Sequence, residues 1–362
     1  MVQNGKYGIF LAQFMGKPGF GNLMEAAQSV KNMGYTHVQL PDNVFNLRAA
    51  AKSKTYAENK VTGPLGQMGV ETSEISIHIP GQTIAVHPAY MHQFAGFAGM
   101  KRPNMRRLHD WGANRIRLAI DAAVNMGLKT LVGFTGSFLW PYIYEWPQRP
   151  KGMVREAFDE LAKRWLPLIR YAASKGIRIA FELHPGEDVH DGRTFRMFLE
   201  ALERAGATND ELNAVGINFD PSHPILYGQS NEQLVKFLRI WQDRIFAYHV
   251  KDAEINIDEE SGFFGGFAPW DERVGKFRTP GRGQVDFEML AGFIPEDLIW
   301  VLEWEDANQA AEQGAVWGRH YMEYGVLPTE ALQAPAAGTS FDDAFQGSAE
   351  INKMLGWYAF RA

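Results

Sequence analysis

A regular alternation of short apolar runs and longer amphipathic runs constrains the fold of this chain more than any other feature. Eight runs rich in β-branched and aromatic residues predict strands at 7–12, 36–40, 72–79, 129–134, 177–184, 214–220, 245–251 and 298–306. Amphipathic segments predict helices between them at 22–34, 114–127, 155–176, 231–243 and 306–325. Several of these segments end at a glycine, the usual residue after a helix. Eight strand–helix units favour an α/β fold, a (β/α)₈ TIM barrel, over the alternative of an open doubly wound sheet.

Composition narrows the class of protein. The 362 residues are 46% hydrophobic and 22% charged, which indicates a globular chain. The formal net charge of −6 gives no general attraction to nucleic acids or anionic membranes. No apolar run approaches the roughly 18 residues of a membrane span, and the N-terminus lacks a signal-peptide pattern, so we expect a cytoplasmic protein. The chain has no cysteine, so any metal must bind His and carboxylate side chains.

Two connections and the C-terminal segment depart from the simple alternation. The connections at 135–152 and 252–284 are long and rich in aromatic residues. Long ordered loops are usually functional, although these aromatics could equally cover the barrel rim or a subunit contact. A Pro/Ala/Gly/Ser-rich stretch follows residue 326. We therefore expect a catalytic barrel domain at 1–325 and an extension at 326–362 that packs on the barrel or on a neighbouring subunit of a homo-oligomer.

Four potential metal ligands stand at the ends of successive predicted strands. They are Glu182 in FELHPG, Asp220 in INFDPSHP, His249 in YHVKD and Glu303 in VLEWED. In a barrel these strand ends meet at one mouth, and Pro221 ends its strand because it has no N–H to donate. Singly, each could be a helix cap or half of an ion pair. Together, three carboxylates repel one another, so the cluster needs either a cation or shifted pKa values, and a divalent metal resolves the conflict most simply. Oxygen-rich ligation with one nitrogen favours Mn²⁺ and tolerates Mg²⁺, Co²⁺ or Zn²⁺.

Further polar side chains near these strand ends are candidates for substrate contacts. By strand alternation, His184 and Lys251 share the faces of the predicted ligands, and His78 ends the third strand. Lys251 could polarise a carbonyl or pair with a neighbouring carboxylate, while His184 could equally be a packed histidine. In GRGQVDF the glycines permit close backbone approach, and Arg282 could hold a phosphate or carboxylate. Glu305 is the alternative to the predicted ligand on the eighth strand.

The motifs FELHPG, INFDPSH, YHVKD, GRGQVDF and VLEWED resemble those of the xylose-isomerase-like TIM-barrel superfamily. That superfamily includes ketose 3-epimerases, hydroxypyruvate isomerase and inosose dehydratase, and the resemblance covers most of residues 6–325. It implies that Glu182, Asp220, His249 and Glu303 bind one divalent metal. It also implies that His223 contacts substrate hydroxyls or orients a ligand, and that Glu182 and Glu303 exchange protons with substrate carbon on opposite faces. The chain is longer than compact epimerases, so the substrate does not carry over.

Such a site supports proton abstraction next to a carbonyl, through a metal-stabilised enediolate. We expect an isomerase or epimerase of carbohydrate metabolism that acts on a sugar, keto-sugar or glycoside. The alternative with the same site is a dehydratase or lyase. An apurinic-site endonuclease is disfavoured by the acidic charge, since such enzymes need a basic DNA-facing rim and additional ligand histidines. A non-catalytic binding subunit also stays open, because a fold does not fix a function.

Overall fold

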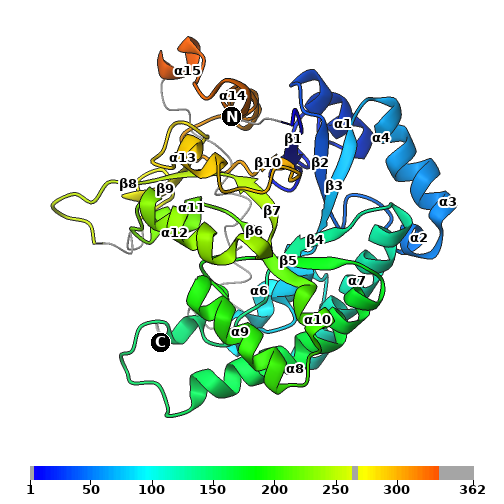
Figure 1. Ribbon diagram of the computed structural model, residues 1–362, viewed down its shortest axis with the longest axis vertical. Helices are drawn as coiled ribbons and strands as arrows, with labels where there is room; N and C mark the ends of the chain where they lie inside the picture. Colours follow the sequence, from blue (N-terminus) through cyan, green and yellow to red (C-terminus); the bar gives the residue numbers. More distant parts are fainter. Residues whose placement is uncertain (1–3, 263–267, 334–362) are drawn as a thin grey trace.

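A closed barrel of eight parallel strands lies at the centre of the computed structural model, which describes residues 4–262 and 268–333 (Figure 1). The strands follow one another around the barrel in the order β1-β10-β7-β6-β5-β4-β3-β2. Their bounds are β1 (Tyr7–Phe10), β2 (His37–Pro41), β3 (Glu71–Ser76), β4 (Thr130–Gly133), β5 (Arg178–Glu182), β6 (Val215–Phe219), β7 (Ile245–Val250) and β10 (Trp300–Leu302). Every neighbouring pair is parallel, which confirms the predicted (β/α)₈ barrel.

Helices connect the strands and surround the barrel (Figure 1). Their bounds are α1 (Leu23–Asn32), α2 (Leu47–Lys52), α3 (Lys54–Ala57), α4 (Gly63–Gln67), α5 (His78–Gln82), α6 (Met91–Phe97), α7 (Met105–Asn125), α8 (Met153–Ser174), α9 (Gly192–Arg204), α10 (Asn209–Asn213), α11 (Ser222–Leu226), α12 (Asn231–Trp241), α13 (Phe287–Ala291), α14 (Ala311–Tyr324) and α15 (Thr329–Gln333). Three of them, α1, α7 and α8, are followed by glycines with positive φ: Gly34 at 85°, Gly127 at 75° and Gly176 at 70°. These glycines end the helices and turn the chain into the next strand, as predicted.

Some predicted boundaries were wrong. The third strand ends at Ser76, and His78 begins the short helix α5 instead of ending the strand. The helix predicted from residue 114 begins at Met105, where the Asn104 side chain accepts from the Arg107 N–H. The long connection after the seventh strand contains an antiparallel pair, β8 (Asp252–Ile255) with β9 (Gly275–Arg278), which was not predicted. The predicted eighth strand is therefore β10.

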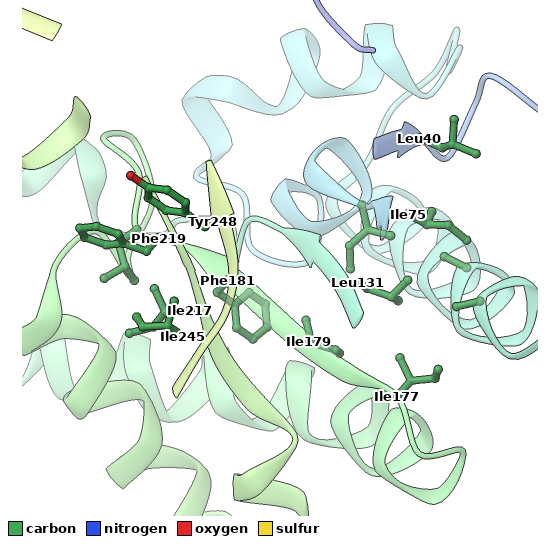
Figure 2. Packing of buried hydrophobic residues seen from close by; sticks show 14 of the residues in the cluster. Leu40, Ile75, Leu131, Ile177, Ile179, Phe181, Ile217, Phe219, Ile245 and Tyr248 are labelled. Atoms are coloured by element: carbon green, nitrogen blue, oxygen red, sulfur yellow. The ribbon is translucent and has the colours of Figure 1, made fainter. Parts of the chain in front are cut away.

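Strand alternation divides the apolar core into two parts. On β5, Ile179 and Phe181 belong to the large core, and Phe181 packs edge-on against Trp165 of α8 at 4.7 Å between ring centroids. Figure 2 shows such side chains from neighbouring strands, including Phe181 and Ile179. Ala180 belongs instead to a small cluster with Val132, Phe246 and Ala247. Because Glu182 shares the parity of Ala180, its carboxylate points into the barrel above this apolar floor.

After α14 the chain forms one more short helix, α15, whose Ala331 is buried. Residues 334–362, most of the predicted extension, lie outside the described residues, so the domain boundary at 325 stays a prediction. Among the described residues, no helix is long and apolar enough to cross a bilayer.

Candidate metal centre and active site

Four buried side chains meet where strands β5, β6, β7 and β10 end. Glu182 is the last residue of β5, Asp220 follows β6 directly, His249 lies in β7, and Glu303 follows β10 directly. Each is at most 4% exposed. One potential ligand atom from each lies within 4.8 Å of the other three. We call these residues the four-residue cluster, and the barrel brings them together as the strand spacing predicted.

The turn after β6 explains how Asp220 is held. Its Oδ1 accepts hydrogen bonds from the Ser222 N–H at 2.8 Å and the Ser222 hydroxyl at 2.6 Å. Pro221 precedes α11, so the strand ladder stops and the chain folds back over this carboxylate. The other oxygen, Oδ2, is buried and lies 3.0 Å from Lys251 Nζ. Asp220 therefore anchors its own loop with one oxygen and presents the second to the cluster.

Three histidines surround Glu182. Its Oε2 lies 3.1 Å from His78 Nε2 and 3.1 Å from His249 Nδ1, and its Oε1 lies 3.0 Å from His223 Nε2. Burial acts to raise the pKa of Glu182, but the His249 charge and the hydrogen bonds from the histidines bring it well below its ordinary range. Glu182 is therefore an ionised carboxylate at neutral pH. The predicted residues His78 and His223 both lie in its immediate surroundings.

Lys251 supplies positive charge to the carboxylates of the cluster. Its Nζ lies 3.0 Å from Asp220 Oδ2, 2.8 Å from Glu303 Oε2 and 3.2 Å from Glu305 Oε2. Burial acts to lower the pKa of Lys251, but these carboxylates raise it well above its ordinary value. Of the two roles considered from the sequence, these contacts favour pairing with carboxylates over polarising a substrate carbonyl. Glu305 lies one step outside the four-residue cluster, against Lys251.

His249 shows how crowded the negative charge is. Its Nδ1 lies 3.0 Å from Glu303 Oε2, and its Nε2 lies 3.0 Å from the Gln39 amide oxygen. Burial acts to lower the pKa of His249, but Glu303 and Glu182 raise it well above its ordinary value. Protonated His249 and Lys251 thus supply two positive charges against three carboxylates. A divalent cation suits the same donors, since carboxylate oxygens and one imidazole nitrogen are hard and borderline ligands within mutual reach.

Of the two remaining residues predicted to contact substrate, His184 lies next to the four-residue cluster and Arg282 does not. His184 packs edge-on to His223 at 4.3 Å between ring centroids and also packs on Phe134 at 4.6 Å. Glu182, His184 and His223 form a second group with ligand atoms close together, which shares its glutamate with the four-residue cluster. Arg282 lies elsewhere: it donates to Gln309 at 3.1 Å and to the Ala331 carbonyl at 3.3 Å. These contacts favour a structural role for Arg282 over the predicted anion binding.

Two buried amides were missed from the sequence. The Asn218 amide donates to Glu182 Oε2 at 3.0 Å, and the Gln39 amide donates to Glu74 Oε2 at 3.3 Å. Asn218 and Gln39 are fully buried within strands β6 and β2. A polar amide inside an otherwise apolar strand was the available signal, because such a group must find buried hydrogen-bond partners.

The fold is a (β/α)₈ barrel, and its buried acids and histidines gather at the C-terminal ends of the strands, where barrel enzymes carry their active sites. The chain belongs to the xylose isomerase-like TIM barrel family, whose model matches residues 27–322. This membership confirms the resemblance seen in the sequence motifs. An inosose dehydratase is among the curated proteins similar to this chain, and a 3-keto-D-glucoside 4-epimerase and an L-ribulose 3-epimerase are among the solved structures with a similar fold.

Individual similar proteins cover different shares of the chain. Inosose dehydratase of Clostridium botulinum is 29% identical over 177 residues, which are 46% of this chain and 54% of that protein. The chain thus spans about half the length of this curated relative. The crystal structure of 3-keto-D-glucoside 4-epimerase from E. coli has a TM-score of 0.54 at 16% identity, covering 87% of this chain and 99% of the other. A Mycobacterium smegmatis xylose isomerase-like barrel in complex with magnesium has a TM-score of 0.54 at 15% identity, covering 83% and 86%.

Proposed function

We propose that this protein is a divalent-metal-dependent isomerase or epimerase that acts on a sugar, keto-sugar or glycoside by removing a proton next to a carbonyl. The convergence of Glu182, Asp220, His249 and Glu303 carries the proposal, because three buried carboxylates and one imidazole offer ligands to a single cation. Mn²⁺ is the first choice. Similarity to a barrel solved with magnesium supports a divalent cation without selecting this metal.

When bound, the cation supplies positive charge that acidifies a C–H next to the substrate carbonyl. The protein supplies two ionised carboxylates for the proton. Burial and the nearby Glu182 charge act to raise the pKa of Glu303, but Lys251 and His249 outweigh them and hold it below its ordinary range. β5 and β10 are separated by β6 and β7 in the barrel, so Glu182 and Glu303 approach the centre from different sides. One carboxylate can accept the substrate proton, and the other, once it has taken a proton from solvent, can deliver that proton to the opposite face.

The histidines around Glu182 fit this role. His78 and His223 each hold one oxygen of its carboxylate, which fixes the orientation of the group before substrate arrives. His223 also lies 3.4 Å from Asp220 Oδ2, and its Nδ1 has no hydrogen-bond partner among the described residues. A substrate hydroxyl could satisfy that buried nitrogen. We therefore propose that His223 positions Glu182 and contacts a hydroxyl of the substrate.

A dehydratase is the second candidate, and similarity to inosose dehydratase favours it. Both reactions begin with the same proton removal. They differ in whether the proton returns or a β-substituent leaves, so the products separate them. Keto-sugars and 3-keto-glycosides incubated in deuterated solvent with Mn²⁺ should gain deuterium at the reacting carbon, which NMR detects. Elimination products would instead identify the dehydratase.

The controls for this experiment come from the site itself. Glu303→Gln should abolish deuterium gain, since an amide cannot accept the proton. Glu288→Gln changes an exposed glutamate in α13 and should leave exchange unchanged. A wild-type protein that binds Mn²⁺ and exchanges no carbon-bound proton in any substrate of the panel would overturn the proposal.

A further inference from the structure

A second cavity lies beside the barrel mouth, outside the four-residue cluster. Its volume is about 240 Å³, and none of the four cluster residues lines it. It is lined by α5, α6, the short segment before α6 and the connections that follow β4 and β5, and it opens to solvent. The side chains that matter for its chemistry are Gln82, Tyr90, Gln93, Phe94, Trp140 and Glu187. Since roughly 10–15 Å³ of such space already holds one water, this volume admits a small molecule the size of a sugar ring.

Two matching contacts connect this cavity to the four-residue cluster. His78, at the start of α5, lies 3.1 Å from Glu182 through its Nε2. Gln82, at the end of α5, donates from its Nε2 to Glu187 Oε1 at 3.1 Å. The four residues from His78 to Gln82 advance a helix by about 6 Å. One short helix, α5, therefore contacts both Glu182 and the lining of the cavity.

Close packing fixes α5, the helix that lies beside both the cavity and the cluster. A Cβ at Gly81 would lie 2.1 Å from the Phe134 carbonyl oxygen, so α5 sits directly against the end of β4. The ring of Phe134 contacts His78 edge-on at 4.4 Å between centroids. The Gly136 N–H donates to Glu187 Oε2, which fixes the next turn of the same connection. These contacts hold α5 against the connection after β4 that lines the cavity.

The lining suits an uncharged, hydroxyl-rich ligand. Trp140, Tyr90 and Phe94 offer aromatic surface, on which the apolar face of a sugar ring can pack. No described residue hydrogen-bonds the side-chain amide of Gln93, so that amide is available to a ligand. Among the described lining residues there is no Lys or Arg, the side chains that recognise phosphate and carboxylate.

Glu187 is the one acidic residue among the described lining residues, and it is compatible with an uncharged ligand. Its side chain is 2% exposed. Burial raises the pKa of Glu187 to about 8, so the group is mostly neutral at pH 7. A neutral carboxyl adds hydrogen-bonding capacity without attracting a cation or repelling a hydroxyl.

We propose that this cavity is a subsite for the second, uncharged ring of a glycoside whose first ring lies at the four-residue cluster. The inference deepens the proposed function and rests on it, because it assigns a two-ring, non-phosphorylated substrate. Gln93 and Trp140 are the specificity-determining side chains, through an amide that can bond ring hydroxyls and an aromatic face that can pack on the ring.

Binding measurements on the full-length, Mn²⁺-loaded protein test this directly. The probes are maltose, cellobiose and lactose, the methyl glycosides of their single rings, and cellobiose phosphorylated on its terminal ring. Titration calorimetry and saturation-transfer NMR should show at least one disaccharide binding about tenfold more tightly than its methyl glycoside, which corresponds to about 1.4 kcal/mol. The phosphorylated disaccharide should bind more weakly than cellobiose, because no described cation lines the cavity.

Variants locate the effect. Trp140→Ala and Gln93→Ala should each remove most of the disaccharide advantage and leave methyl glycoside binding unchanged. Tyr144→Ala, on the same connection but 70% exposed, should change neither. Thermal unfolding of each variant establishes that it is folded. Equal binding of one-ring and two-ring probes by the wild-type protein would overturn the subsite, as would full retention of the advantage in both cavity variants.

The outcomes also separate this inference from the proposed function. A protein that exchanges the α-proton of single-ring keto-sugars and shows no preference for two rings keeps its proposed function and loses the subsite. A protein that prefers disaccharides in the manner described and exchanges no proton keeps the subsite as a binding site and loses the proposed chemistry.

Discussion

Lys251 Nζ lies 2.8 Å from Glu303 Oε2, inside a pocket where the lysine side chain is 1% exposed. The same ammonium group lies 3.0 Å from Asp220 Oδ2. Lys251 thus occupies the charge-balancing position next to two of the proposed metal ligands. A bound divalent cation would neutralise the same carboxylates that Lys251 neutralises. In the metal-free protein the lysine therefore reduces the repulsion among these carboxylates and stabilises the folded state.

Replacing Lys251 should therefore separate the stability of the metal-free protein from its response to metal. In Lys251→Met, two buried carboxylates lose their partner, so we expect the free energy of unfolding without metal to fall by about 3–5 kcal/mol. Added Mn²⁺ should recover more stability in this variant than in the wild type. Urea unfolding with and without Mn²⁺ measures both. Lys163→Met, whose side chain is 78% exposed, is the matched control.

Metal removal gives a second prediction. Because a ligand that binds only the folded state stabilises it by mass action, Mn²⁺ at a hundredfold excess over its Kd should add about 2.7 kcal/mol. A chelator should reverse this gain. Asp220→Asn should show little of it, since the Oδ2 atom that faces the cluster becomes part of a neutral amide. If Asp220→Asn gains as much as the wild type, while metal analysis shows equal occupancy, Asp220 is not a ligand.

Glu187 predicts a pH dependence of stability that is independent of the metal site. Burial raises its pKa from 4.5 to about 8 in the folded protein. The unfolded chain therefore releases this proton near pH 4.5, whereas the folded protein keeps it until about pH 8. In that interval the folded state binds more protons, so stability falls as pH rises and levels off above about pH 8.

The measurement compares wild type with Glu187→Gln by chemical unfolding between pH 5 and pH 9. The variant cannot titrate at this position, so the difference in free energy between the two proteins should change with pH in the direction stated. Glu288→Gln should follow the wild-type curve, because Glu288 is exposed. A constant difference across the whole interval would show that Glu187 does not hold its proton.

Asp252 should be essential to the connection that carries β8 and β9. Its Oδ2 accepts from the N–H groups of Gly281 at 2.9 Å and Gly283 at 2.8 Å, and its Oδ1 accepts from Val285 at 3.0 Å. In Asp252→Asn the new NH₂ group faces buried donors, so we expect a loss of about 2–3 kcal/mol. Thermal unfolding measures the loss. Asp258→Asn, on an exposed part of the same connection, should cost far less.

Much of the fold was predictable because local pattern and topology agree. The alternation of strand and helix, with Gly34, Gly127 and Gly176 after three helices, was sufficient to predict eight parallel strands in a closed barrel. The glycines of GRGQVDF were read as points of close backbone approach. In the structure a Cβ at Gly283 would lie 2.2 Å from Asp252 Oδ1, so the approach is to this carboxylate. The β8–β9 pair was missed, because its strands are only four residues long and separated by a long connection.

The candidate site was predictable only in its outline. Strand ends and residue parity brought Glu182 and His249 to one mouth before any coordinates were considered. Asn218 and Gln39 carry no motif, and their roles depend on which side chains the neighbouring strands present to them. Arg282 shows the reverse case: its loop was correctly placed after the seventh strand, yet its guanidinium turns to Gln309.

The sequence by itself determined the barrel and the identity of the four strand-end residues, since hydrophobic period and chain order set which ends share one mouth. Tertiary structure alone decided the rest: that Lys251 is shared among three carboxylates, that three histidines hold Glu182, and that Gln82 meets Glu187 beside a second cavity. These contacts join residues far apart in the chain. Their distances depend on strand register and loop packing, which no local pattern of residues encodes.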